Sequence, residues 1–226
     1  MSASPISRFA FALLVACFVG IAAAQDKPVD IEALKASAKQ GSTRAMRQLG
    51  DMYYVGRDGV EQNFPEAVHW YTMLANRGDR RGQTILGTMY ARGYGVQKNS
   101  ETARYWWLKA AERDDAGAQY DLGTLYYRGE GVAQDYKVAA DWYRRAAQIG
   151  HVNAQKNLAG MFWEGKGVEK NPQLAYYWFK VASLLGDDDS QESLAVVAKS
   201  MNPGQVRDAD EQADTWMRRY KKIVGD

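Results

Sequence analysis

Residues 129–151, GEGVAQDYKVAADWYRRAAQIGH, recur in altered form three more times in this 226-residue chain. The four copies begin at Gly56, Gly93, Gly129 and Gly165, and the last two steps between them are 36 residues long. The first step is one residue longer, because the glycine-rich segment of the first copy has one extra residue. A fixed period in the range of about 20–50 residues is typical of a solenoid or array. We therefore predict a repeat protein.

A second motif, A-x-x-x-L-G-x-x-Y, precedes each copy and is marked by Leu49, Leu86, Leu122 and Leu158. Its apolar residues are spaced by four, which places them on one face of a helix. The residue after each leucine is Gly or Ala, and a small residue lets a neighbouring helix approach closely. Glycine inside a helix costs about 1 kcal/mol relative to Ala. Its recurrence therefore predicts a close helix–helix contact in each repeat.

The quoted stretch itself predicts a turn followed by a second helix. The glycines of the turn can supply the positive φ that ends a helix. The second helix is expected to start after an N-cap residue and to end near Gly78, Asp114, Gly150 or Gly186. The expected N-caps are Asn63, Asn99, Asp135 and Asn171. The Ala-x-x-Trp pattern in this helix places Trp70, Trp106, Trp142 and Trp178 in the predicted core.

Outside the repeats, the apolar spacing predicts helices that cap the array. Residues 25–44 are expected to contain one capping helix, over Asp30–Gln40, and residues 190–226 to contain further ones. There, Leu194 and Ala195 fill the leucine and small-residue positions, and a last helix starts at Asn202-Pro203. The repeats themselves are predicted at 45–81, 82–117, 118–153 and 154–189.

The first 24 residues have the composition of an export signal. Arg8 is followed by the apolar run 9–24, which ends in Ala22-Ala23-Ala24, and these are the parts of a secretory signal peptide. We expect cleavage after Ala24 and a periplasmic or secreted location. An alternative is a lipid anchor at Cys17, because residues 14–17, LVAC, resemble a lipoprotein processing site. Apart from this run, no apolar segment is long enough to span a bilayer.

The combined motif, A-x-x-x-L-G-x-x-Y-x-x-G-x-G-V-x-x-(D/N)-x-x-x-A-x-x-W-Y-x-x-A-A-x-x-G, resembles that of the Sel1-like repeat family, which is related to tetratricopeptide repeats. The resemblance covers residues 45 to about 189. It implies an all-α fold, a right-handed α/α superhelical solenoid of antiparallel helix pairs. It also implies a non-enzymatic adaptor of the bacterial cell envelope, tied to signalling, exopolysaccharide production or host interaction.

The residue content argues against several other functions. Lys and Arg number 29 against 27 Asp and Glu, which lacks the basic excess expected of a nucleic-acid-binding protein. His69 and His151 are the only histidines and Cys17 is the only cysteine, so a metal site is not expected. The chain has no G-x-S-x-G, Ser-x-x-Lys or phosphate-binding glycine loop. We therefore expect no enzyme activity, no cofactor and no metal.

The resemblance to tetratricopeptide arrays places the first helix of each repeat on a concave groove. The predicted groove residues are Arg47, Asp51, Tyr54, Thr84, Thr88, Arg92, Tyr120, Thr124, Tyr127, Arg128, Lys156 and Trp163. Arg, Tyr and Trp are frequent in binding hot spots, although these aromatic residues could equally pack between repeats. We expect a monomer that binds an envelope protein or peptide there. The alternatives are a glycan-binding module, in which the aromatic side chains stack on sugars, and a cell-wall or β-lactam hydrolase.

Overall fold

The computed structural model describes residues 29–225, and within them the chain forms eleven α-helices and no strand. The helices are α1 (Ile31–Lys39), α2 (Thr43–Val55), α3 (Phe64–Asn76), α4 (Arg80–Arg92), α5 (Ser100–Ala111), α6 (Ala116–Arg128), α7 (Tyr136–Gln148), α8 (Val152–Glu164), α9 (Pro172–Leu184), α10 (Asp189–Ala198) and α11 (Pro203–Val224). None of them is long and apolar enough to cross a membrane. The predicted export signal and Cys17 lie outside the described residues.

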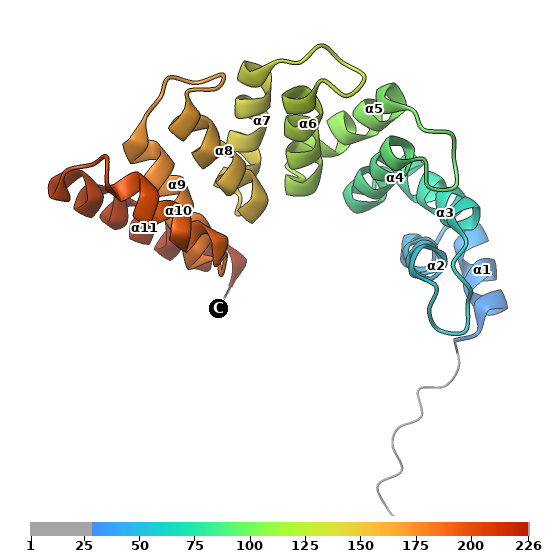
Figure 1. Ribbon diagram of the computed structural model, residues 1–226. Helices are drawn as coiled ribbons and strands as arrows, with labels where there is room; N and C mark the ends of the chain where they lie inside the picture. Colours follow the sequence, from blue (N-terminus) through green and yellow to red (C-terminus); the bar gives the residue numbers. More distant parts are fainter. Residues whose placement is uncertain (1–28, 226) are drawn as a thin grey trace, which may run out of the picture.

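The helices stack in pairs along an arch (Figure 1). The first helices of the repeats, α2, α4, α6 and α8, lie on its inner side, and α3, α5, α7 and α9 lie on its outer side. Each first helix packs against the second helix of its own repeat and against the helix that precedes it, which is α1 for α2 and the second helix of the preceding repeat for α4, α6 and α8. The predicted all-α solenoid of helix pairs is confirmed.

The predicted helix ends are also confirmed. Asn63, Asn99, Asp135 and Asn171 are the N-caps of the outer helices, and each side chain accepts a hydrogen bond from a backbone N–H of the first turn. The inner helices end at left-handed glycines such as Gly93, whose φ is 74°. At the end of α5 the same left-handed conformation falls on Asp114, with a φ of 58°. The turn is therefore retained there without glycine.

A contact between a glycine and an aromatic ring joins the two helices of each of the first three repeats. Gly123 in α6 and Tyr143 in α7 form one such pair, and both are buried. A Cβ added to Gly123 would lie 2.6 Å from the Tyr143 ring. The equivalent pairs are Gly50–Tyr71 and Gly87–Trp107. The close helix contact predicted from the recurring glycine is therefore confirmed, and the ring that fills it follows the repeated tryptophan position.

The expected burial of all four repeated tryptophans is only half correct. Trp70 and Trp178 are buried, whereas Trp106 and Trp142 are only partly buried. In the two central repeats the next residue, Trp107 or Tyr143, points under the inner helix and is buried instead. Trp142 packs at the edge of the preceding repeat, and the Arg145 guanidinium carbon lies 4.7 Å from the centre of its ring. In these two repeats the first aromatic residue joins successive repeats and the second fills the core, whereas in the fourth repeat Trp178 is buried and Phe179 is only partly buried.

Buried glutamines add a repeated hydrogen bond across each junction between repeats. Gln119 in α6 is buried, and its amide nitrogen donates to the Ala111 carbonyl of α5 at 3.2 Å. Gln83 and Gln155 make the same bond to Ala75 and Ala147. The acceptors are carbonyls in the last turn of the outer helices, and each also accepts from the backbone N–H of Gly78, Asp114 or Gly150. The glutamine therefore adds a second hydrogen bond to a buried carbonyl and fixes the next repeat against it.

The C-terminal end departs from the repeat. α11 packs on α9 and does not form a pair with α10, and Ala195 of α10 is therefore exposed. The expectation that Ala195 occupies a close helix contact is wrong. The link between α10 and α11 lacks the Gly-x-Gly turn of the repeats. Ala209 and Ala213 are the buried residues of α11, which covers the last outer helix, α9, as a cap.

We predict that Gly123→Ala destabilises the array, because the added methyl group would overlap the Tyr143 ring. Overpacking of a core costs about 1–3 kcal/mol, and the gain in helix propensity offsets about 1 kcal/mol of it. Gly160→Ala is the matched control, since a Cβ on Gly160 of α8 meets nothing within 4 Å. It should be neutral or stabilising by up to about 1 kcal/mol. Urea denaturation measures both, and equal effects would contradict the packing role of Gly123.

Candidate partner-binding surface

The inner side of the arch carries three neighbouring pockets, each between two successive inner helices. The first, between α2 and α4, is lined by residues that include Asp51, Tyr54, Val55, Arg57 and Arg81. The second, between α4 and α6, includes Thr88, Arg92, Lys98, Asp121 and Arg128. The third, between α6 and α8, includes Tyr120, Tyr127, Lys156 and Glu164. The second has a volume of about 490 Å³ and is the largest of the three.

Nine of the twelve residues predicted for the groove line these pockets. They are Asp51, Tyr54, Thr88, Arg92, Tyr120, Thr124, Tyr127, Arg128 and Lys156. Arg47, Thr84 and Trp163 are not among the lining residues. Arg47 and Thr84 instead contact the residues that cap the next inner helix, and Trp163 packs at the edge of the C-terminal core.

Arg47 and Thr84 belong to a set of contacts that we call the N-cap pairs. In each pair, the residue two before the repeat leucine contacts a residue whose side chain accepts from the first turn of the next helix; this residue is the N-cap of α4, α6 and α8, and in the fourth pair it directly precedes the N-cap of α10. Arg47 forms an ion pair with Asp79, Thr84 donates to Asp115 at 3.0 Å, Tyr120 stacks on His151 at 4.6 Å between ring centroids, and Lys156 pairs with Asp187 at 3.0 Å. The capping partners accept from backbone N–H groups at the start of α4, α6, α8 and α10.

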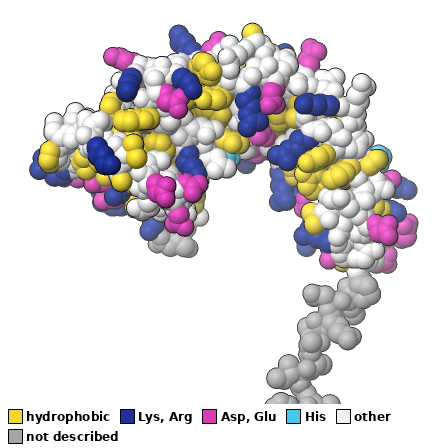
Figure 2. Space-filling model, in the orientation of Figure 1, with side chains coloured by type: hydrophobic (Ala, Val, Ile, Leu, Met, Phe, Trp, Pro, Cys, Tyr) yellow, Lys and Arg dark blue, Asp and Glu magenta, His cyan; other side chains and the backbone are white. Residues whose placement is uncertain are grey.

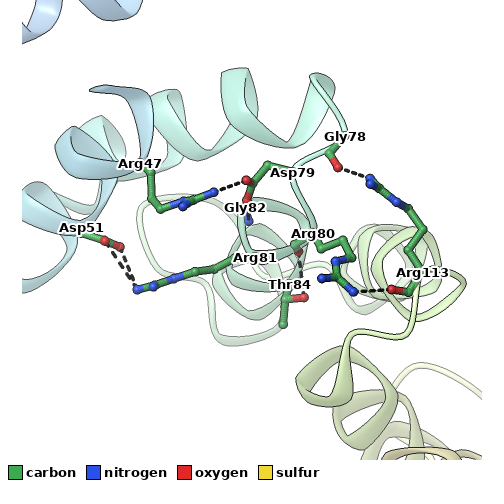
Figure 3. Close-up of polar contacts among 9 residues, drawn as sticks. All are labelled: Arg47, Asp51, Gly78, Asp79, Arg80, Arg81, Gly82, Thr84 and Arg113. Carbon is green, nitrogen blue, oxygen red and sulfur yellow. Dashed lines mark hydrogen bonds and ion pairs between the residues drawn. The ribbon is translucent and has the colours of Figure 1, made fainter. Parts of the chain in front are cut away.

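The junction between α2 and α4 shows how such contacts accumulate (Figure 3). Asp79 accepts from both Arg47 and the Gly82 backbone, while Arg81 reaches back to Asp51 at 3.4 Å. On the other side, Arg113 donates to the Gly78 carbonyl. Several polar groups on this part of the inner surface are therefore already used to hold successive repeats together.

The aromatic residues of the predicted groove also make internal contacts. Tyr54 packs edge-on against Phe64, with ring centroids 5.6 Å apart. Tyr127 does the same with Tyr136 at 5.1 Å. The ammonium of Lys170 lies 5.2 Å from the centre of the Trp163 ring. These three contacts lie within single repeats, and among the three rings Tyr54 also lies 6.4 Å from the ring of Tyr94 in the next repeat.

The cations of the pockets differ in whether a carboxylate neutralises them. Arg57, Arg81, Arg128 and Lys156 each have an Asp or Glu oxygen within 3.6 Å. Arg92 and Lys98, both exposed in the pocket between α4 and α6, form no ion pair within residues 29–225. The guanidinium carbon of Arg92 lies 5.9 Å from the centre of the Tyr94 ring. The two pocket cations without an ion pair therefore both lie in the largest inner pocket.

Asp121 lies in the same pocket and was absent from the predicted groove. It is partly buried and accepts from the Thr88 hydroxyl at 3.3 Å. Burial raises the pKa of this carboxyl to about 6, against the opposing effects of Thr88 and the positive charge of Arg92. The equivalent positions hold Gln48, Ile85 and Asn157, so disagreement among the copies could have identified this position from the sequence.

No group of three or more His, Cys, Asp or Glu side chains suited to a metal ion occurs in the part of the chain that the structure describes. His151 is occupied as a helix cap, with its ring nitrogen accepting from the Ala154 backbone at 3.3 Å. Burial lowers the pKa of this imidazole, which favours the neutral form that a capping acceptor requires.

We predict that Asp121→Asn stabilises the protein near neutral pH. The native carboxyl keeps its proton up to about pH 6, whereas the unfolded one loses it near 3.8, so its contribution to stability falls as pH rises between these values. The free energy of unfolding of the variant should exceed that of the wild type by about 1–3 kcal/mol near pH 7.5, and this difference should shrink near pH 4.5. Urea denaturation of both proteins at both pH values measures it. A pH-independent difference would contradict a titrating Asp121; the titration of His151 is common to both proteins.

Comparison with known proteins agrees with this architecture. The chain is 32% identical to c5321, described as a protective antigen of uropathogenic Escherichia coli strains with an SLR fold, with a TM-score of 0.77 over 84% of this chain and 41% of that one. It is also 32% identical to a Sel1 repeat protein from Oxalobacter formigenes, with a TM-score of 0.65 over 74% of this chain and 48% of that one. It thus spans less than half of either relative.

A shorter match joins the chain to a plant protein. Over 64 residues it is 37% identical to the ERAD-associated E3 ubiquitin-protein ligase component HRD3A of Arabidopsis thaliana. The matched segment is 28% of this chain and 9% of that protein. The Sel1 repeat model matches residues 43–79, 81–115, 116–151 and 152–187, which together make up most of the chain. With four matched repeats and the stacked helix pairs that such repeats form, this chain belongs to the Sel1 repeat family.

Proposed function

We propose that this protein is a binding scaffold whose inner surface holds a segment of a partner protein. Sel1 repeat proteins are generally scaffolds for protein interactions. The observation that carries the proposal is the row of three pockets, which runs along one side of the arch from α2 to α8. A continuous row of pockets suits an extended or helical segment better than a small molecule.

The distribution of variation along the repeats supports the same surface. The glycine–aromatic contacts and the buried glutamines recur from repeat to repeat, because each unit needs them in order to pack. The residues that line the inner pockets change from one repeat to the next, as Thr88 and Thr124 against Asp51 illustrate. Recognition of a partner requires variable side chains on a surface whose backbone is held in place by recurring packing contacts, and the inner surface has both.

We further propose that the protein acts outside the cytoplasm, in the cell envelope or beyond it. This proposal rests on the basic residue, apolar run and small-residue ending of residues 8–24. The mass of the intact exported protein tests it, and a chain that begins at Gln25 is expected. A lipidated chain that begins at Cys17 would replace the secreted form by an anchored one, and an unprocessed chain in the cytoplasm would contradict export.

We predict that a photo-crosslinking amino acid on the inner surface captures the partner in cells that produce the protein. Val55 and Glu164 are exposed and line the first and third pockets, so both positions should yield adducts that mass spectrometry identifies. Tyr105 of the outer helix α5, which is 50% exposed, is the matched control and should yield none. Adducts from Tyr105 alone would place the partner on the outer surface and contradict the proposal.

A further inference from the structure

We propose that the pocket between α4 and α6 anchors an acidic segment of the partner through Arg92 and Lys98. This inference rests on the proposed function, since it assumes that a partner lies along the inner surface. It specifies the chemistry of one place on that surface, namely side-chain carboxylates of Glu or Asp on the partner, held by two cations of this pocket.

The first argument is the unequal neutralisation of charge along the inner surface. The cations of the first pocket are paired, Arg57 with Asp58 and Arg81 with Asp51. Lys156 of the third pocket contacts both Asp187 and Asp189, at 3.0 and 2.9 Å. A carboxylate beside a cation cancels much of the positive potential around it, so a paired cation attracts a second carboxylate less strongly than an unpaired one does.

Arg92 and Lys98 differ in having no such partner within the described chain. Arg92 ends α4 and Lys98 lies in the following turn, so both are exposed at the edge of the same pocket. Figure 2 shows Lys and Arg side chains gathered on the inner side of the arch in the region of α4 and α6. Arginine and carboxylate form charge-assisted hydrogen bonds, and clusters of basic residues are used to recognise acidic motifs.

The one unpaired acidic group of this pocket lies deeper than the cations. Asp121 is partly buried and bonded to Thr88, whereas Glu130 is paired with Arg128 at 3.3 Å. An approaching segment therefore meets Arg92 and Lys98 first. The hydroxyl of Ser100 also lines the pocket and can donate a hydrogen bond to a carboxylate. Asp121 opposes a bound carboxylate and should weaken its binding.

The test uses a fluorescently labelled hexaglutamate peptide, with hexaglutamine as the uncharged control, and fluorescence anisotropy at low ionic strength. Hexaglutamate should bind the wild-type protein more tightly than hexaglutamine. The double variant Arg92→Gln/Lys98→Gln should weaken hexaglutamate binding about 3- to 10-fold, as expected for two exposed charge contacts. The matched double variant Arg57→Gln/Arg81→Gln removes the same charge from paired positions and should change the affinity by less than about 2-fold.

Asp121→Asn supplies a test of opposite sign. Removal of its negative charge should tighten hexaglutamate binding by about 2- to 5-fold. Equal losses from the two double variants, weaker binding by Asp121→Asn, or equal affinity for the two peptides would each overturn the proposal. Circular dichroism of each variant separates a loss of binding from a loss of folding.

Crosslinking distinguishes this proposal from the function on which it rests. Arg92→Gln/Lys98→Gln should reduce the partner adducts formed from Val55 and Glu164, and excess hexaglutamate should compete with them. If these adducts persist in both experiments, the acidic anchor is wrong while binding to the inner surface stands. If neither position gives adducts in the otherwise wild-type chain, the proposed function itself is wrong, whatever the peptide results.

Discussion

The structure depends on the close approach of an inner and an outer helix at a single small residue. In the third repeat, Gly123 lets the ring of Tyr143 lie directly against the inner helix, where a Cβ would overlap it. The ring then fills the space between the helices and excludes water from the surrounding alanines, which are fully buried. A glycine in mid-helix costs about 1 kcal/mol relative to Ala, and the burial of an aromatic ring offsets that cost. The same compensation operates in each of the first three repeats, and the helices can stack regularly because of it.

Much of the fold could be predicted because the same pair of helices is encoded four times in the sequence. The helix boundaries followed from Asn or Asp caps and turn glycines, which act locally and depend little on the rest of the chain. Burial of individual aromatic residues was harder to predict. The adjacent pair Trp106-Trp107 looks equally apolar in sequence, and only the angle at which the helices meet decides which ring is covered. The position of α11 depends on a missing turn, and its packing on α9 could not be read from its amphipathic pattern.

The inner surface was predicted less completely. The groove positions are projected from a related repeat, and this projection does not predict that the residue two before each leucine also serves in an N-cap pair. The position before each leucine is not among those projected, although Ile85 and Asn157 at the equivalent places also line inner pockets. That Asp121 bonds to Thr88 and shares a pocket with Arg92 of the preceding repeat cannot be read from either repeat alone. The copies could show where variation occurs, but they could not show which variable side chains meet.

The N-cap pairs bear on how such an array can change its length. Both members of each pair fall within one matched repeat: Arg47 and Asp79 in 43–79, Thr84 and Asp115 in 81–115, Tyr120 and His151 in 116–151, Lys156 and Asp187 in 152–187. The buried glutamine that reaches back across the junction binds a backbone carbonyl, which any preceding unit can offer. A gene segment encoding one whole unit can therefore be duplicated or lost without separating either member of a pair from the other. For the same reason, one repeat can use an ion pair, the next a hydroxyl hydrogen bond and the next an aromatic stack. Each repeat contains both members of its own pair, so it does not depend on the chemistry of its neighbours.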